Sequence, residues 1–229
     1  LLHLDPETCP YSLAALSQFP LKAPRPFVER IERGNWHDPL LKQIWPAIEE
    51  QSKSESFVPD PLDEQNFNPV PGLLHKYQGR VLLTAAPHCA IHCRYCFRRH
   101  FDYRANSPSR KQWDSAFSYI AEDSSIEEVI LSGGDPLALS DRQFSWLMQQ
   151  LAGIEHLTAV RIHSRLPIVI PRRVTAELLQ CLSESRLRIV MVVHCNHARE
   201  LDTAVADCFS ALDAIGVTML NQSVVLKGV

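Results

Sequence analysis

The sequence predicts an α/β fold in which parallel strands alternate with helices, preceded by a helical and irregular extension. From Arg80 onward, apolar runs of strand length alternate with amphipathic segments of helix length. The strand-like runs are rich in Val, Ile and Leu, as expected for parallel strands that are buried on both faces. Residues 1–75 lack this alternation and carry eleven of the 16 prolines. We therefore divide the chain into an N-terminal extension, residues 1–75, and a barrel-like domain, residues 76–229.

Five strands are predicted, at 81–85, 128–131, 159–162, 189–193 and 217–220. Repeated strand–helix units of about 30 residues predict a parallel sheet with right-handed crossovers. A complete eight-stranded barrel needs about 250 residues, and about 150 residues follow Arg80. The predicted fold is therefore a partial barrel or an open doubly wound sheet.

Several helix starts carry capping signals in the sequence. Ser109 with Gln112, and Ser140 with Gln143, form S-x-x-Q capping boxes. Thr175 is a predicted N-cap for the helix that follows it. In the extension, two short helices are predicted, at 26–33 and 39–50.

Composition and charge exclude some partners. With 23 basic and 26 acidic residues the net charge is −3, which argues against a nucleic-acid partner. No apolar run approaches the roughly 20 residues of a membrane span, so we expect no membrane partner. Seven cysteines without a recognisable secretory signal indicate a reducing compartment. We therefore expect a cytoplasmic protein.

Basic residues gather in two groups. Such groups are often solvated loop charges, but here they flank the motifs described below and favour a small anionic ligand. The first group is Arg94, Arg98, Arg99, His100 and Arg104, and the second is Arg161, Arg165, Arg172 and Arg173.

Three cysteines, Cys89, Cys93 and Cys96, lie within eight residues in a C-x3-C-x2-C pattern. A [4Fe-4S] cluster fully bound by protein needs four thiolates, so three would leave one iron open to a ligand. Two alternatives remain: a zinc site completed by His92 or His100, and a cluster closed by Cys195. The open cluster is the preferred interpretation because no second zinc-binding knuckle follows.

Polar clusters follow each of the five predicted strands. Taken singly, Gly133-Gly134 could be a tight turn, the histidines packed polar residues, and Arg165 a structural ion pair. Active sites of barrels are built at the carboxyl ends of the strands, so five clusters in equivalent positions predict one site. After the cysteine loop, the clusters are residues 132–136, 163–165, 194–197 and 221–223.

These motifs resemble those of the lysine 2,3-aminomutase family of radical S-adenosylmethionine (SAM) enzymes. Tyr95 immediately precedes the third cysteine, as in the radical SAM signature. The resemblance runs from about residue 26 to Val229 and is most similar to the bacterial branch called elongation factor P (R)-β-lysylation protein. The motifs that carry it are PGLLHKY at 71–77, CRYCFRRH at 93–100, LSGGDPL at 131–137, RIHSRLP at 161–167 and LNQSV at 220–224.

The resemblance implies a partial (β/α) radical-SAM barrel with three cofactors: a [4Fe-4S] cluster, SAM and pyridoxal 5′-phosphate (PLP). The implied metal ligands are Cys89, Cys93 and Cys96. The implied SAM residues are Gly133, Gly134, Asp135, Arg165, His194 and Gln222. The implied contacts to the PLP phosphate are Lys76, Tyr77 and Arg80. Arg98 matches the position that binds the substrate α-carboxylate, for which a planar fork is well suited.

The implied activity is that of an isomerase, which converts free L-α-lysine into (R)-β-lysine. A 5′-deoxyadenosyl radical from SAM removes a β-hydrogen, and the nitrogen, carried by PLP, moves from Cα to Cβ. A reductant protein would supply the electron, and the product would pass to the lysyl ligase of elongation factor P. A homo-oligomer is compatible with the sequence, which does not define the assembly. Alternatives are an aminomutase for another amino acid, such as glutamate, and a non-enzymatic zinc or iron–sulfur module.

One departure from the family pattern concerns PLP. None of the six lysines of the chain matches the family's Schiff-base lysine, and the carboxylates that bind the substrate ε-ammonium are not matched either. We therefore expect the sequence to be cut short at its C-terminal end.

Overall fold

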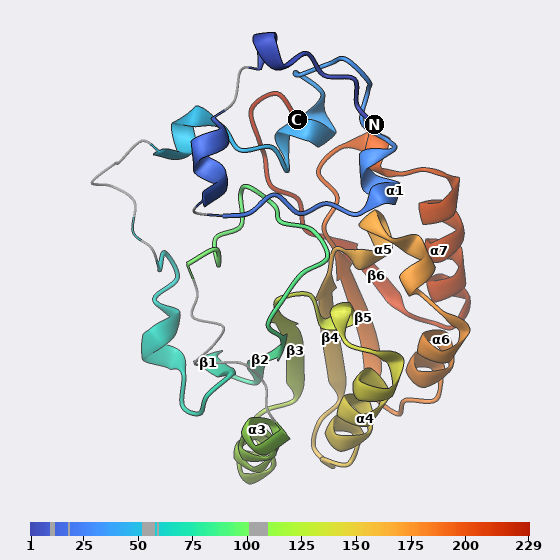
Figure 1. Cartoon of the computed structure of the whole chain (residues 1–229). Coiled ribbons are helices and arrows are strands. Elements are labelled where there is room, and N and C mark those ends of the chain that lie inside the picture. Colours follow the sequence, from blue (N-terminus) through green and yellow to red (C-terminus); the bar gives the residue numbers. More distant parts are fainter. Residues whose placement is uncertain (10–11, 18, 52–57, 59, 101–109) are drawn as a thin grey trace.

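The computed structural model describes residues 1–9, 12–17, 19–51, 58, 60–100 and 110–229 of the chain. Figure 1 shows a sheet with helices along one side and the N-terminal extension at one end. Contacts such as Gln43 to Arg165, which directly follows a strand, place the extension over the end where the parallel strands finish. No helix in the described part of the chain combines the length and apolar character that a membrane span requires.

Six strands form one sheet in the order β1-β2-β3-β4-β5-β6. The strands are β1 (Leu73–Tyr77), β2 (Arg80–Ala86), β3 (Glu128–Gly133), β4 (Ala159–Ser164), β5 (Arg188–Val193) and β6 (Thr218–Asn221). Strands β2 to β6 are parallel, which confirms all five predicted strands to within two residues at each end. Because the spatial order follows the chain order, the sheet winds in one direction, as in a barrel. An open doubly wound sheet would reverse its order at a switch point.

The antiparallel strand β1 was not predicted. It pairs with β2 through a two-residue connection, Gln78-Gly79, in which Gly79 has φ +76°. A glycine between two short apolar runs is a hairpin signal that the sequence does contain. Strand β1 crosses the division at residues 75/76, so the separation of extension and barrel domain stays a prediction.

Four helices lie outside the sheet, and they are α3 (Arg110–Glu122), α4 (Asp141–Ala152), α6 (Ala176–Ser183) and α7 (Thr203–Ala214). The capping box of Ser140 and Gln143 and the N-cap Thr175 are confirmed. The box predicted at Ser109 falls outside the described residues. A row of fully buried residues crosses the sheet beneath these helices, from Leu83 through Leu131 and Ile162 to Met191. These residues form part of the core between the sheet and the helices.

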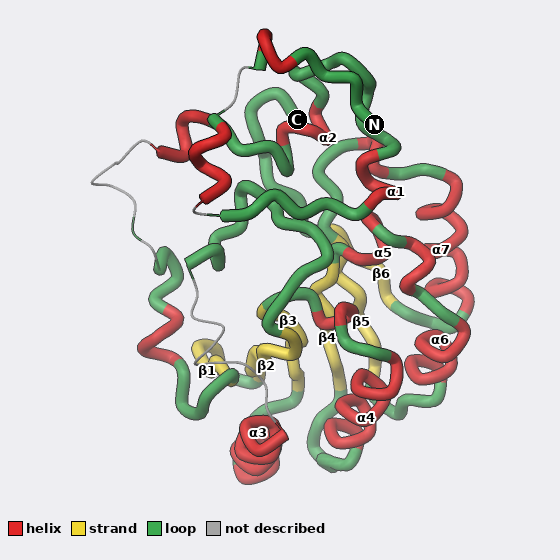
Figure 2. Tube along the Cα trace, viewed as in Figure 1, coloured by secondary structure: helices red, strands yellow, loops and turns green. Residues whose placement is uncertain are grey.

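The helices of the extension are shorter than predicted, as Figure 2 shows. Instead of 26–33 and 39–50, the structure has α1 (Arg25–Val28) and α2 (Pro39–Lys42). Pro46 stops the second helix because proline disfavours helical geometry before it. The first helix, α1, ends before Arg30. The Arg30 side chain donates to the carbonyl of Pro26, and the Arg30 backbone N–H donates to the carbonyl of Phe27 rather than to that of Pro26.

Short helical turns complete the structure. The remaining α-helix is α5 (Leu166–Val169), which follows β4. The 3-10 turns are η1 (Pro6–Thr8), η2 (Leu13–Ser17), η3 (Ile48–Gln51), η4 (Glu64–Phe67), η5 (Pro136–Ala138), η6 (Pro171–Arg173) and η7 (Ala198–Glu200).

Candidate active site

Residues from several strand ends meet around one hollow of about 150 Å³, called the cysteine cavity below. All the residues predicted for the cluster and for SAM line it, and so does Arg98. The lining residues are Cys89, Ile91, Cys93, Tyr95, Cys96, Phe97, Arg98, Ser132, Gly133, Gly134, Asp135, His163, Arg165, His194, Gln222 and Val224. The prediction that the polar clusters at the strand ends lie together is confirmed, because residues of these clusters line one cavity.

A second cavity, also about 150 Å³, adjoins β1 and β2 and is called the basic cavity. The three residues predicted for the PLP phosphate lie in its wall, and Arg98 belongs to both cavities. Its lining residues are Leu62, Glu64, Phe67, Leu74, Lys76, Tyr77, Arg80, Val81, Leu82, Arg98 and Ile130.

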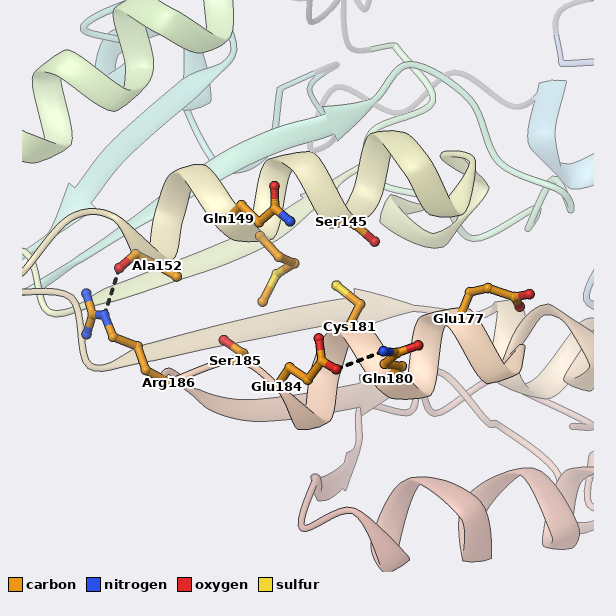
Figure 3. A pocket seen from close by; sticks show the side chains of 10 residues that line it. Ser145, Gln149, Ala152, Glu177, Gln180, Cys181, Glu184, Ser185 and Arg186 are labelled. Atoms are coloured by element: carbon orange, nitrogen blue, oxygen red, sulfur yellow. Dashed lines mark hydrogen bonds between the residues drawn. The ribbon is translucent and has the colours of Figure 1, made fainter.

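A larger hollow of about 510 Å³ lies between α4 and α6, on the outer side of the helices (Figure 3). On its α6 side, Gln180 donates to Glu184 at 2.8 Å. Arg186 donates to the carbonyl of Ala152 at its end. None of the predicted site residues reaches it, so its size does not mark it as the candidate active site.

In its described part, residues 87–100, the cysteine loop after β2 forms no helix or strand and is held by the N-terminal extension. Lys22 donates its ammonium group to the carbonyl oxygen of Cys89 at 2.7 Å. The backbone N–H of Arg94 donates to the carbonyl oxygen of Gln43 at 2.9 Å. These bonds fix the loop at Cys89 and at Arg94, in a described stretch that forms no helix or strand of its own.

The environment of the three thiols fits an iron–sulfur cluster. Burial raises the pKa of the Cys89 and Cys96 thiols. Asp135 raises the pKa of Cys89 further, and Cys93 raises the pKa of both thiols. Three such sulfurs are stable together as thiolates when a cationic group compensates them. The Cys93 sulfur accepts an N–H from Arg165, and the backbone N–H groups of Asp135 and Arg98 lie near Cys89 and Cys96 and lower the pKa of these thiols in part. Hydrogen bonds of this kind surround the sulfurs of iron–sulfur centres.

The zinc alternative lacks support from the geometry. Within the described ranges, no three His, Cys, Asp or Glu side chains are grouped to hold a metal ion. A cluster differs because each thiolate binds a different iron. The His92 ring stacks on Phe19 at 4.7 Å between centroids, and its Nδ1 lies 2.8 Å from the Pro20 carbonyl. It therefore belongs to the contact with the extension.

Closure of the cluster by Cys195 is not supported either. Cys195 does not line the cysteine cavity, and its Sγ donates to the carbonyl of His197 at 3.5 Å. The three sulfurs that share the cavity are those of Cys89, Cys93 and Cys96.

Gly133 and Gly134 allow the end of β3 to approach the cysteine loop. Gly133 has φ +98°, which favours glycine, and an added Cβ on Gly134 would lie 2.5–2.7 Å from backbone atoms of Ala86 and His88. The N–H groups of Gly134 and Asp135 donate to the carbonyls of Ala86 and His88. These donors brace the cysteine loop. Binding of SAM by this segment stays a prediction.

The carboxylate of Asp135 is buried and joins the ends of two strands. It accepts bonds from the Ser164 hydroxyl at 2.7 Å and from the backbone N–H groups of Leu137, Arg165 and Leu166. Burial raises its pKa in spite of these bonds. The side chain therefore positions Arg165, and the contact of Asp135 with SAM stays a prediction.

Two histidines form a neutral polar wall in the cysteine cavity. The rings of His163 and His194 meet edge to face, 6.0 Å between centroids. Burial lowers the pKa of each to about 4. Among the described residues, their Nε2 atoms and the Nε of Arg165 are buried without a partner. Unpaired polar atoms at one cavity indicate a polar ligand. His163 was not among the predicted SAM residues, although it directly precedes Ser164 and Arg165.

Because the pKa values of these two histidines are lowered, we expect the free energy of unfolding to fall in acid. Between pH 6.5 and 4 the unfolded chain binds protons at His163 and His194, whereas the folded chain does not. Stability is therefore complete above pH 6.5 and falls by about 3 kcal/mol per histidine as the pH drops to 4. Urea unfolding of the metal-free chain at several pH values measures this. The double variant H163Q/H194Q should lose part of the pH dependence, and an unchanged slope would contradict the assignment.

Arg98 stands between the two cavities and is paired with Glu64 from η4. Its Nε donates to both carboxylate oxygens at 3.1 and 3.0 Å, its Nη2 to Oε1 at 2.5 Å, and its Nη1 to the hydroxyl of Ser132 at 3.0 Å. Within the described part of the chain, these bonds use three of the five N–H donors of an arginine. The other two N–H donors of Arg98 have no partner among the described residues.

Most arginines of the two basic groups are bonded to carboxylates. Arg94 and Arg99 both pair with Glu50, at 2.5 and 2.9 Å, which ties η3 to the cysteine loop. The other pairs are Arg161–Glu128, Arg165–Glu200 and Arg173–Asp141. Arg104 is outside the described residues. Most of these arginines therefore have carboxylate partners within the chain, and the small anionic ligand stays a prediction. Arg98 is the member that lines both cavities.

Comparison with known proteins decides the family. Residues 83–192 match the Radical SAM superfamily. L-lysine 2,3-aminomutase of Haemophilus influenzae is 49% identical over the whole chain, which covers 68% of that protein. The chain belongs to the lysine 2,3-aminomutase family. The protein of the same name from Escherichia coli is 47% identical over 94% of the chain and 63% of its own length. The one from Buchnera aphidicola is 44% identical over 92% of the chain and 62% of its own length.

Membership of the lysine 2,3-aminomutase family implies three cofactors: a [4Fe-4S] cluster, SAM and PLP. The chain spans about two thirds of the length of these relatives. Three sulfurs with N–H donors, beside buried unpaired polar atoms, fit the cluster and SAM. Lys76 and Arg80 fit a phosphate dianion in the basic cavity. In this structure the Lys76 ammonium group donates to the carbonyl of Leu62 at 2.7 Å, and the Arg80 side chain is half-exposed.

Proposed function

We propose that the chain carries the cluster, SAM and phosphate sites of a radical SAM, PLP-dependent aminomutase that converts L-α-lysine into (R)-β-lysine. The observation that supports it is the position of Arg98, which lines both cavities. An amino acid whose carboxylate meets Arg98 would lie between the cysteine cavity and the basic cavity. Radical formation and nitrogen transfer require that arrangement, because the reacting groups must be in contact.

When bound, the cluster and SAM supply a carbon radical, and PLP carries the migrating nitrogen. The residues of the chain bind and orient these groups. Arg98 would hold the substrate carboxylate, while Lys76, Tyr77 and Arg80 would bind the phosphate. Ile91, Phe97 and Val224 give the cysteine cavity apolar walls, of which Ile91 is buried and the other two are partly exposed. None of the six lysines is assigned to the imine with PLP.

We further propose a cytoplasmic enzyme that receives its electron from a reductant protein. The product would be consumed by the lysyl ligase that modifies elongation factor P. The family similarity supports these roles, and a homo-oligomer is compatible with them.

The test of the proposed function is an anaerobic assay of the reconstituted full-length protein with SAM, PLP and a chemical reductant. L-lysine and L-glutamate are supplied in parallel, and β-amino acid formation is measured. The proposal expects (R)-β-lysine from lysine and a much lower rate with glutamate. Preferential turnover of glutamate would overturn the assignment of the substrate.

A prediction for Arg98 concerns substrate binding. Arg98→Lys keeps the charge but removes the fork, so we expect KM for lysine to rise about 10- to 100-fold, the value of one charge-assisted bond. Arg99→Lys is the matched control, because Arg99 pairs with Glu50 and lines neither cavity. Equal KM values for the two variants would contradict the role of Arg98.

A further inference from the structure

Arg165 joins a cysteine sulfur to a buried polar network. It follows Ser164 at the end of β4, and its side chain is 4% exposed. One terminal nitrogen, Nη1, donates to the Sγ of Cys93 at 2.7 Å and to the hydroxyl of Tyr95. A cationic donor in direct contact with a thiolate in a dry interior interacts strongly with its charge.

The counter-ion of Arg165 is Glu200, which is fully buried. Its Oε2 accepts from Nη2 of Arg165 at 3.1 Å. Its Oε1 accepts from the side chain of Gln43 at 2.9 Å and from the backbone N–H groups of Asn196 and His197 at 3.0 and 3.1 Å. These bonds hold the anion on the side of the guanidinium group away from its contact with Cys93.

The other two sulfurs have neutral backbone N–H groups nearby, that of Asp135 at Cys89 and that of Arg98 at Cys96. Cys93 is thus distinguished, among the described contacts, by a charged side-chain donor. The reduction potential of an iron–sulfur cluster depends on hydrogen bonds to its sulfurs and on nearby charge. A cation at a thiolate stabilises the reduced state, which carries one more electron.

We infer that Arg165 raises the reduction potential of the cluster through Cys93, and that Glu200 opposes it. This inference rests on the proposed cluster site. Gln43, in the loop after α2, also accepts from Nη2 of Arg165 at 2.6 Å. The N-terminal extension therefore contributes to the potential by fixing the orientation of the guanidinium group. Arg165 is a positioning residue in this respect, because it acts on the cluster through its ligand.

The test is a potentiometric titration of the reconstituted chain, followed by electron paramagnetic resonance of the reduced cluster. Arg165→Gln should shift the potential to a lower value, and Glu200→Gln should shift it to a higher value. Arg173→Gln is the control, since Arg173 pairs with Asp141 and lies outside the cysteine cavity. Its potential should equal that of the unmodified chain. Opposite shifts cannot result from general loosening of the site, which would move both variants in one direction.

Arg165→Gln leaves Glu200 buried without its partner and could prevent folding. If Arg165→Gln does not fold, the variant Arg165→Lys is used in its place, because lysine keeps the charge but loses the planar fork. A lower reduction potential of Arg165→Lys supports the inference. An intact cluster with an unchanged potential in the Arg165 variant, or shifts of the same sign in both variants, overturns the inference alone. Failure of the unmodified chain to bind iron and sulfide overturns the proposed cluster site as well.

Discussion

Replacing Cys93 with alanine is expected to abolish cluster binding completely. Cys93 is the central thiolate of the three in the cysteine cavity, and two remaining thiolates cannot hold a [4Fe-4S] cluster that already has an open iron. The substitution also removes the sulfur that Arg165 contacts. Iron and acid-labile sulfide are measured per chain after anaerobic reconstitution. The iron and sulfide content expected for Cys93→Ala is close to that of the unmodified chain prepared without added iron.

Cys195→Ala is the matched control for this substitution. Cys195 is also half-buried but donates to His197 and lies outside the cavity lining. It should bind iron and sulfide like the unmodified chain. Full iron content in Cys93→Ala, or loss of iron in Cys195→Ala, would contradict the assignment of the ligands. Uptake of one zinc ion in place of iron would support the non-enzymatic zinc module.

Gly134→Ala is expected to have the second largest effect. Its Cβ would lie 2.5 Å from the carbonyl oxygen of His88 and 2.7 Å from that of Ala86, and backbone atoms cannot rotate away. Overpacking against a fixed wall costs about 3 kcal/mol or more. The end of β3 and the cysteine loop must then separate, so we expect loss of both stability and SAM binding. Urea unfolding and a SAM binding titration measure the two effects.

Gly153→Ala provides the comparison for this prediction. Gly153 ends α4 with φ −72°, and an added Cβ would meet the nearest atom, the Gln150 carbonyl oxygen, at 3.3 Å. The stability of this variant should change by less than about 1 kcal/mol. Equal unfolding midpoints for Gly134→Ala and Gly153→Ala would show that the close approach seen at Gly134 is not important.

The parallel strands and their polar ends could be predicted because they follow simple patterns. Apolar runs identified β2 to β6, and the carboxyl ends of parallel strands meet at one edge, which brought Cys93, Gly134 and His194 together. Choice between a barrel and an open sheet required the strand order, which depends on contacts distant in sequence.

The partners of the site arginines could not be predicted. Glu64 and Glu50 lie in short 3-10 turns of a proline-rich extension, where no periodicity indicates which side chains face the barrel. The buried position of Gln43 beside Arg165 likewise results from tertiary packing. The family resemblance implied Asp135 as a SAM residue, whereas its bonds to Ser164 and Arg165 depend on how two strand ends meet.

The most direct test of the account is the electron paramagnetic resonance spectrum of the reduced cluster, recorded with and without SAM. The central claim is that the three thiolates leave one iron open and that SAM binds there. The account predicts that SAM changes the spectrum of the unmodified chain and that Cys195→Ala behaves in the same way. A reduced cluster whose spectrum is identical with and without SAM would contradict it.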